Sequence, residues 1–369
     1  MRRINCNTEA FLALLRAGLW EQNVNLAVFE SIDFSEIYRL AQEQSVVGLV
    51  AAGLEHVVEK RVPQAIALTF AGDTLQLEQR NLEMNLFVGV LFEKMRLDGI
   101  NALLVKGQGI AQCYERPLWR ACGDIDILLD YDNYVKANAL LTPLATTIEK
   151  EHHHLKHKSF IIDSWVVELH GTLRSELGAR VDGVIDEIQK DTFENNKKRN
   201  WHDGDVIVGI PEVNNDVIFV FTHILQHFFI GGIGLRQIGD LCRLIWMYRN
   251  DIDHKMLEYR LRGMGIMSEW KVFAAFAVGW LGMPEEAMPH YDSGKRWKRQ
   301  AEIVLKDIIK AGNFGHNRDL SHQKEMNTIV RKLETFCYFT KFSLQHAMLF
   351  PASSLRVWLR MVKDGLKFN

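Results

Sequence analysis

The segment at residues 101–129, NALLVKGQGIAQCYERPLWRACGDIDILL, constrains the fold of this chain more than any other segment. Two short apolar runs, typical of buried strands, enclose a glycine-containing turn and a polar loop. The predicted elements are, in order, a strand at 102–105, a turn at Lys106-Gly107-Gln108-Gly109, one or two helical turns at 110–114, a polar loop at 115–123 and a second strand at 125–129. The segment therefore predicts part of a sheet with a helix against it.

Two acidic residues, Asp124 and Asp126, lead into the second strand. Because side chains alternate between the faces of a strand, both carboxylates lie on one face, while Ile125 and Ile127 point into the core. Two carboxylates a few ångströms apart repel each other unless a cation lies between them. A hard divalent cation such as Mg²⁺ prefers oxygen ligands and keeps waters that a substrate phosphate can replace. The pair is a candidate metal site, and a strand end with two solvated acids is the alternative.

A third acid, Glu168, lies in the apolar run at 165–170, WVVELH, which predicts another strand. The run at 154–162 predicts a strand that pairs with it, and Asp163-Ser164 between them predicts a tight hairpin turn. His170 follows Glu168 by two positions and therefore shares its face of the sheet. The sequence thus offers a further carboxylate that a sheet could bring beside the two aspartates.

Residues 100–250 resemble the uncharacterised bacterial nucleotidyltransferases, a branch of the polymerase-β-like nucleotidyltransferase superfamily whose turn is Lys-Gly rather than Gly-Ser. The matching pieces are LLVKGQGIAQCYERPLWRACGDIDILL, VVELH and HILQHFFIGGIGLRQIGDLCRL. The Lys-Gly turn, the R-x-x-G-D spacing before the acids and the V-E-L-H strand together carry the resemblance. It implies an α+β fold in which a polymerase-β-like core, a mixed sheet with flanking helices, lies between an N-terminal and a C-terminal helical region.

The resemblance also implies roles for the three acids. Asp124 and Asp126 would bind Mg²⁺ or Mn²⁺, and Glu168, which we count with them as a metal and catalytic residue, would activate the acceptor. The reaction expected from this site is transfer of a nucleoside monophosphate from a nucleoside triphosphate to an acceptor hydroxyl or phosphate, by in-line displacement at the α-phosphorus.

The turn and the loop before the acids supply the candidates for nucleotide binding. Backbone N–H groups at a turn that opens a helix attract phosphate, and Lys106 could add a point charge beside Gly107. The superfamily's serine hydroxyl is missing here, so Gln108 would offer an amide instead. Arg120 could neutralise charge on the leaving pyrophosphate. The alternatives are an ordinary turn that requires glycine and, for Arg116 and Arg120, surface pairing with Asp130 or Asp132.

Two histidine groups lie outside this set. The motif H-x-x-x-H followed by G-x-G-L-R-Q-I-G-D places His223 and His227 on one face of a helix. By resemblance this element packs at the mouth of the site, with Arg236 and Asp240 as an ion pair. Buried histidines satisfied by helix contacts are the alternative. A second group, His152, His153, His154 and His157, indicates a zinc site only weakly, because strand alternation divides these side chains between two faces.

The chain is predicted to have three parts, an N-terminal helical region (1–98), an α/β core (99–210) and a C-terminal helical region that begins after Pro211 (211–369). The N-terminal region should contain a helix from Thr8, a second from Asp33 or Ser35 to Gly53, and an amphipathic third at 65–97. The apolar positions expected in the third helix include Leu77, Leu82, Leu86 and Val90. The later helices are expected at 132–141, 181–190, 214–229, 235–249, 254–264, 267–281, 295–311, 323–342 and 353–366.

Composition limits the partners. A net charge of −2 over 369 residues gives no general attraction for nucleic acid, so such a partner would need a local basic patch. The five cysteines contain no C-x-x-C pair, which argues against a disulfide framework. No apolar run reaches about 18 residues and no signal-peptide core is present, so we expect a reduced, cytoplasmic protein without a membrane partner.

The acceptor stays open at this stage: a small molecule, a protein side chain and an RNA end all agree with the sequence. Two other functions compete with nucleotidyl transfer. One is a catalytically silent protein on the same fold that binds a nucleotide or a partner, which the altered Gly-Ser turn favours. The other is a histidine-dependent metal hydrolase, which would hold zinc rather than magnesium.

Overall fold

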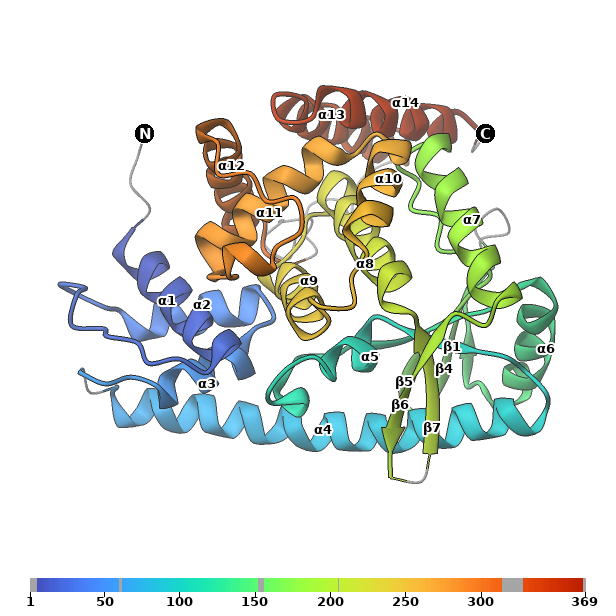
Figure 1. Cartoon of the computed structure of the whole chain (residues 1–369), viewed down its shortest axis with the longest axis horizontal. Helices are drawn as coiled ribbons and strands as arrows, with labels where there is room; N and C mark the ends of the chain where they lie inside the picture. Colours follow the sequence, from blue (N-terminus) through green and yellow to red (C-terminus); the bar gives the residue numbers. More distant parts are fainter. Residues whose placement is uncertain (1–4, 60–61, 152–155, 205, 314–327, 368–369) are drawn as a thin grey trace.

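The computed structural model describes residues 5–59, 62–151, 156–204, 206–313 and 328–367. A long helix, α4 (Gln64–Leu97), runs along one edge of the molecule (Figure 1). The N-terminal helices pack at one end of α4, the sheet packs towards the other, and the C-terminal helices lie on the opposite side of the molecule. The α+β architecture with helical regions before and after a mixed sheet is confirmed.

The N-terminal region consists of α1 (Cys6–Trp20), α2 (Phe34–Glu43) and α3 (Val47–Glu55). The Asp33 side chain caps α2, as expected. The prediction of one helix from there to Gly53 is wrong, because the chain turns at Ser45, whose φ is +55°. Helices α1 and α3 pack closely at Gly18, where a Cβ atom would lie 1.8 Å from the carbonyl oxygen of Leu49.

Helix α4 is apolar on two opposite sides. Met84, Val88 and Met95 are buried against the sheet and its surroundings. Three of the four positions expected to form its apolar face, Leu82, Leu86 and Val90, are exposed, and Leu77 is half-buried. The expected pattern therefore identified the wrong face, because a helix that is apolar on two opposite sides gives no single direction for its core side.

The central sheet has five strands in the order β1-β2-β5-β4-β3. Strands β2 and β5 are parallel and the other neighbours are antiparallel, so the sheet is mixed. One face is apolar and packs with α4 and α6, and the opposite face carries the polar residues of β2 and β5. The strands are β1 (Leu103–Val105), β2 (Asp124–Leu128), β3 (Thr147–Ile148), β4 (His157–Ile162) and β5 (Trp165–His170).

Local sequence explains the connections around the sheet. Asp163 and Ser164 both have positive φ, 47° and 71°, which is typical of the tight β4–β5 hairpin that the sequence predicted. Helix α6 (Tyr131–Leu141) is capped by the side chain of Asp130 and begins one residue before the predicted helix at 132–141. The short helix α5 (Gly107–Ala111) begins directly after β1, and the 3-10 helix η1 (Pro117–Trp119) lies in the loop before β2.

Beyond the sheet, α7 leads to a two-stranded hairpin that lies against α4, and seven α-helices and one 3-10 helix follow within the described residues. Helices α8 and α9 cover the polar face of the sheet, as the pocket that they line with it shows. In the described part of the chain, no helix is long and apolar enough to cross a bilayer. These elements are α7 (Ala179–Glu194), β6 (Lys198–Asp203), β7 (Val206–Pro211), α8 (Val213–Ile230), α9 (Leu235–Met247), α10 (His254–Met264), α11 (Met267–Leu281), η3 (Glu285–Ala287), α12 (Lys295–Ala311), α13 (Thr328–Ala347) and α14 (Pro351–Lys367).

Candidate active site

A cavity of about 200 Å³ lies where the polar face of the sheet meets α8 and α9. Strand β2, strand β5 and the turn before α5 form its floor. It is lined by Lys106, Gly107, Ile110, Arg120, Asp124, Asp126, Glu168, Val220, His223, Ile224, His227, Arg236, Gln237 and Asp240. Most of the residues singled out in the sequence therefore meet in one cavity, although they come from distant segments.

The three acids converge because β2 and β5 are parallel neighbours. In the register of this pair Asp126 lies directly beside Glu168, and Asp124 lies one step towards the start of β2 on the same face. Asp126 is only 3% exposed, whereas Asp124 is exposed at the end of the strand. The expected grouping of carboxylates on one face is what the sheet produces.

Lys106 completes the floor of the cavity. Its φ of +59° is a left-handed conformation that is uncommon outside glycine, and Gly107 follows with a φ of +40°. This turn directs the Lys106 Nζ to 2.9 Å from Asp126 Oδ1. Burial favours a lower pKa for Lys106, but the charges of Asp126, Asp124 and Glu168 outweigh it and raise the pKa above its usual value. Lys106 is therefore held as a cation inside the acid cluster.

Two histidines flank the acids. His170 Nε2 lies 2.7 Å from Asp126 Oδ1 and 3.5 Å from Glu168 Oε2, and His157 Nε2 lies 3.0 Å from the same Glu168 oxygen. The ligand atoms of His157, Glu168 and His170 all lie within 4.8 Å of one another, a grouping that could hold a metal ion. The sequence interpretation placed His170 near the acids but assigned His157 only to the weakly indicated zinc group, and the other histidines of that group (152–154) lie outside the described residues.

The signal that could have identified His157 is the hairpin register. The tight turn at Asp163-Ser164 pairs Ile162 with Trp165, and counting back along both strands then pairs His157 with His170. Directly opposed residues of an antiparallel pair share one face of the sheet. The two imidazole rings indeed lie 4.8 Å apart between centroids.

The electrostatics of the three acids differ. Repulsion by Asp126, and then burial, raises the pKa of Asp124 above its usual value. Burial also opposes ionisation of Asp126, but Lys106 and His170 lower its pKa below the usual range. Burial likewise opposes ionisation of Glu168, and hydrogen bonds from His157 and His170 overcome it and lower the pKa. Asp126 and Glu168 are thus stabilised as anions, whereas Asp124 is not.

A buried ion pair forms the wall opposite the sheet. Arg120 Nε and Nη2 donate to Asp240 Oδ1 and Oδ2 at 3.0 and 2.6 Å, and the Tyr114 hydroxyl donates to Asp240 Oδ1 at 2.8 Å. The expected pair between Arg236 and Asp240 is therefore wrong. Arg236 Nη1 instead donates to the carbonyl oxygen of Ala121 at 2.6 Å. Arg120 thus binds both oxygens of the Asp240 carboxylate, which is the strong bidentate form of this pair.

Two other expectations about the turn and the loop need correction. Gln108 is 2% exposed and its amide donates to Asn81 Oδ1 at 3.1 Å, so its side chain does not line the cavity. It is held there because Asn81 also donates to two carbonyl oxygens of the loop before β2. Arg116 and Arg120 do not pair with Asp130 or Asp132 at the surface: Arg116 contacts Glu21 and Glu55.

His223 and His227 close the cavity from α8, with ring centroids 4.3 Å apart. Burial and the nearby Lys106 charge lower the pKa of His223 well below its usual value and that of His227 to about 4. Both imidazoles are therefore neutral near pH 7. They also line an adjoining cavity of about 230 Å³ together with Lys106, His157, Glu168, His170, Thr172, Leu173, Arg174, Phe219 and Gln226.

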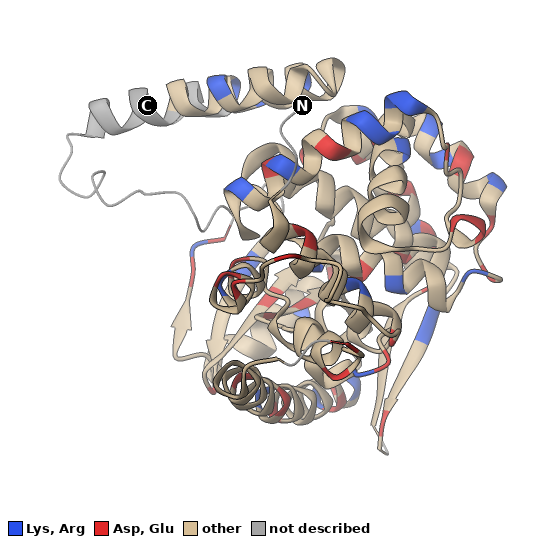
Figure 2. Ribbon diagram, turned by 90° about the vertical axis from the view of Figure 1, so that its left-hand side faces the viewer, with Lys and Arg blue, Asp and Glu red and all other residues tan. Residues whose placement is uncertain are grey.

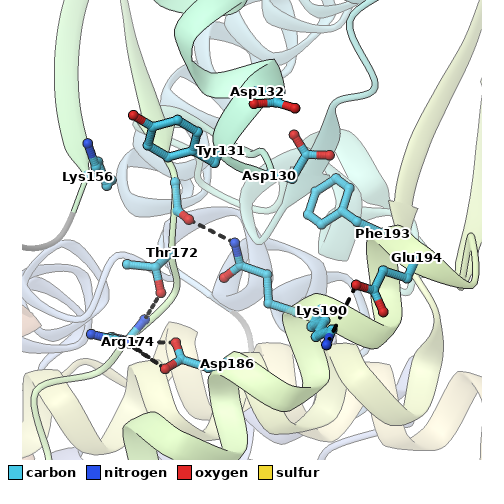
Figure 3. A pocket seen from close by; sticks show the side chains of 12 residues that line it. Asp130, Tyr131, Asp132, Lys156, Thr172, Arg174, Asp186, Lys190, Phe193 and Glu194 are labelled. Atoms are coloured by element: carbon cyan, nitrogen blue, oxygen red, sulfur yellow. Dashed lines mark hydrogen bonds and ion pairs between the residues drawn. The ribbon is translucent and has the colours of Figure 1, made fainter.

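A third cavity, of about 590 Å³, borders the second one through Thr172 and Arg174. Figure 3 shows Arg174 beside Asp186 and Lys190 beside Glu194, whereas Asp130, Asp132 and Lys156 lie apart from these pairs. Arg174 pairs with Asp186 at 2.5 Å and Lys190 pairs with Glu194 at 3.8 Å. This cavity is lined by acidic and basic side chains and adjoins the second cavity through the two shared residues.

The donor set fits a hard divalent cation. Among the described residues, no side chain donates a hydrogen bond to the Asp124 carboxylate, and the charge of Asp126 raises its pKa although Lys106 and Arg236 act in the opposite direction. Carboxylate oxygens of Asp124 and Asp126 are the ligands that Mg²⁺ and Mn²⁺ prefer. Lys106 and His170 both contact Oδ1 of Asp126, so a cation would use the remaining oxygens of the pair.

Comparison with known families agrees with this arrangement. The profile of the uncharacterised nucleotidyltransferases matches residues 30–282, which include every residue that lines the 200 Å³ cavity. Searches of curated proteins and of solved structures gave no significant match.

Proposed function

The chain belongs to the uncharacterised nucleotidyltransferase family, and from this premise we propose that it transfers a nucleoside monophosphate from a nucleoside triphosphate to an acceptor with the help of Mg²⁺ or Mn²⁺. One observation carries the proposal: Asp124, Asp126 and Glu168 face one cavity of about 200 Å³ beside Lys106. Acids that repel one another destabilise a fold, so their convergence is expected only where a cation or a reaction needs them.

In this proposal Asp124 and Asp126 hold the metal ion. A bound Mg²⁺ or Mn²⁺ would supply positive charge against the triphosphate and make the α-phosphorus more electrophilic. The two aspartates have different roles in the proposed site. Asp126 is fixed by Lys106 and His170 and positions the site, whereas Asp124 retains a carboxylate without such partners among the described residues.

The nucleotide phosphates would be bound by this chain's cationic and backbone groups. Lys106 Nζ lies beside Asp126 and faces the cavity, where it can also reach a phosphate oxygen. Backbone N–H groups at Gly107, which begins α5, remain available at the turn. Arg120 lines the same cavity and is held by Asp240, and its buried Nη1 has no hydrogen-bond partner within the described residues. Gln108 contributes through its backbone only, because its amide is used by Asn81.

Glu168 is proposed to accept the proton of the attacking hydroxyl. It lies between the first and the second cavity, and its lowered pKa keeps it ionised at neutral pH. His157 and His170 both contact its carboxylate, so they can orient it and share the proton. The acceptor would then enter through the 590 Å³ cavity and occupy the 230 Å³ cavity beside Glu168. This size favours a small molecule or an extended side chain over a nucleic-acid duplex.

The test measures which phosphate of the nucleotide is transferred. The full-length protein is incubated with Mg²⁺ and each of the four ribonucleoside triphosphates, labelled at the α- or at the γ-phosphate, first alone and then with a panel of small hydroxyl and phosphate acceptors. We expect transfer of the α-label together with release of pyrophosphate. Transfer of the γ-label would indicate a kinase and overturn the proposal. Metal-dependent nucleotide binding without transfer would favour the catalytically silent alternative.

A further inference from the structure

The side of α4 that faces away from the core carries an apolar stripe, which Gln79 and Glu93 interrupt on the same face of the helix. Six large side chains form it, and five of them keep about two-thirds of their surface exposed: Leu68 65%, Leu75 66%, Leu82 43%, Leu86 69%, Val90 71% and Leu97 71%. Exposed apolar patches of this extent are uncommon on monomeric proteins and usually mark an interaction surface. The active-site proposal makes no use of this stripe.

The stripe is one straight face of the helix. At 100° per residue the six positions fall within an arc of about 80°. The buried positions of α4, such as Met84, Val88 and Met95, fall on the opposite side. From Leu68 to Leu97 the stripe is about 45 Å long at 1.5 Å per residue. Figure 1 shows α4 along the lower edge of the molecule, where the β6–β7 hairpin crosses it and extends past it, and Figure 2 views the same helix nearly along its axis.

We propose that this stripe is a dimer interface in which α4 of a second copy packs antiparallel to the first. The spacing of the residues supports self-pairing. Leu68 and Leu75 are seven residues apart, as are Val90 and Leu97, and the two pairs are mirrored about a point between positions 82 and 83. An antiparallel arrangement therefore brings Leu68 opposite Leu97 and Leu75 opposite Val90 of the other copy. A two-fold axis requires this kind of self-complementary surface.

The stripe supplies part of the area that a dimer buries. A strip about 45 Å long and about 10 Å wide covers roughly 450 Å² in projection, and the projecting side chains raise the accessible area above that value. Specific dimers bury about 600–1,000 Å² on each copy. An apolar groove of about 360 Å³ adjoins the N-terminal half of the stripe and is lined by Phe70, Ala71, Leu75 and Trp119, among others. In the antiparallel arrangement the C-terminal end of the other α4 lies over this groove.

The charges on α4 favour a protein partner over a membrane. Helices that bind anionic bilayers carry an excess of Lys and Arg on their polar face. Helix α4 instead carries four acids (Asp73, Glu78, Glu83, Glu93) and three bases (Arg80, Lys94, Arg96). The same helix has small residues, Ala71 and Gly72, between Leu68 and Leu75, which would let a second helix approach closely.

The first test measures the mass of the full-length protein in solution by light scattering after size exclusion, from about 1 µM to about 100 µM. We expect twice the chain mass of 42.5 kDa for the wild type. Val90→Glu should shift the mass to that of a single chain, and Leu75→Glu should do the same independently. Val28→Glu is the matched control, because Val28 lies in a surface turn and is 70% exposed, against 71% for Val90. Both positions are exposed, so folding should be retained, as circular dichroism would check.

The second test determines the orientation by disulfide trapping in a Cys6→Ser, Cys337→Ser background, which removes the cysteines with exposed surface. Leu82→Cys lies next to the proposed two-fold axis and should form a disulfide-linked dimer. Leu68→Cys should not, because antiparallel packing separates the two copies of position 68 by about 43 Å. Mixing Leu68→Cys with Leu97→Cys should restore trapping.

Three results would overturn the proposal. They are a wild-type monomer at every concentration, a dimer that persists in both glutamate variants, and sedimentation with phosphatidylserine vesicles that Val90→Glu abolishes. Efficient trapping of Leu68→Cys with itself would exclude the antiparallel arrangement. None of these results depends on nucleotidyl transfer.

Discussion

Two aspartates that line the same cavity differ in their hydrogen bonds and in their burial. Asp240 receives two hydrogen bonds from Arg120 and one from Tyr114, and all three residues are buried. Asp124 lies across the cavity, is exposed, and receives no side-chain hydrogen bond from the described residues. The first carboxylate is neutralised by the protein itself, whereas the second is left beside another carboxylate whose charge raises its pKa.

The difference separates a structural charge from a functional one. A buried charge that is fully paired holds elements together, here the loop before β2 and helix α9. A charge left next to a like charge costs stability and becomes favourable only when a cation binds. Satisfaction of hydrogen bonds, rather than residue type or position in the cavity, is therefore the observation that distinguishes the proposed metal ligand from the structural acid.

The largest expected effect is on turnover. Asp124→Asn should lower the rate of nucleotidyl transfer by about 10³-fold, because an amide does not hold a hard cation. The free energy of unfolding should stay unchanged or rise slightly, since the repulsion between Asp124 and Asp126 is removed. Label transfer and urea denaturation of the same preparation would measure the two quantities. Asp163→Asn is the matched control, because Asp163 lies in the β4–β5 turn and asparagine accepts its φ of +47°. Equal losses in both variants would contradict the assignment.

Asp240→Asn should lower the stability of the fold and leave metal-dependent nucleotide binding in place. It leaves the buried Arg120 guanidinium without its counter-ion, which should lower the free energy of unfolding by about 3–5 kcal/mol. Urea denaturation would show the change directly. If the folded fraction of the variant retained metal-dependent nucleotide binding, the structural role would be supported. A stable variant that had lost binding would instead give Asp240 a direct role in the site.

His227 provides a pH test of the helix that covers the acids. Burial, with the Lys106 charge, lowers its pKa to about 4, whereas an unfolded histidine has a pKa near 6.5. Between these values the unfolded chain binds more protons than the folded chain, so stability must fall as the pH drops from about 6.5 to 4. The His227→Gln variant should lose this part of the slope, at most about 3 kcal/mol. Denaturation curves measured across that pH range give the free energy of unfolding of both proteins. If His227 were protonated in the folded state, this free energy would depend on pH equally in the wild type and in His227→Gln.

The smallest expected effect concerns Gln108. Its amide donates to Asn81 in the interior, so Gln108→Ala should lower the free energy of unfolding by about 1–2 kcal/mol. The affinity for nucleotide should not change, because the side chain does not line the cavity. Parallel thermal denaturation and nucleotide titration would separate the two. A loss of affinity with unchanged stability would restore Gln108 as a phosphate ligand.

Much of the fold could be predicted because local signals and tertiary structure agree. Alternation on β2 and β5 placed Asp124, Asp126 and Glu168 correctly on one face, and the bounds of α10, α11 and α12 follow from their periodicity. The three-part division of the chain into residues 1–98, 99–210 and 211–369 stays a prediction.

The wrong predictions share a physical cause: each concerns a side chain or a helix face that has more than one possible contact in the folded protein. Sequence alone did not show that Arg120 rather than Arg236 pairs with Asp240, because that choice depends on how the loop before β2 meets α9. It did not show which face of α4 is buried, because both faces are apolar. Gln108 was assigned to phosphate because its buried acceptor, Asn81, comes from a helix distant in sequence.

The most direct test of the central claim is calorimetric titration of each nucleoside triphosphate into the full-length wild type and into Asp124→Asn, with and without Mg²⁺. We predict binding that requires the metal in the wild type, is retained in Asp163→Asn and is lost in Asp124→Asn. Binding of equal strength in Asp124→Asn, or no binding of any nucleotide to the wild type, would contradict the proposal that these acids form the metal site of a nucleotidyltransferase.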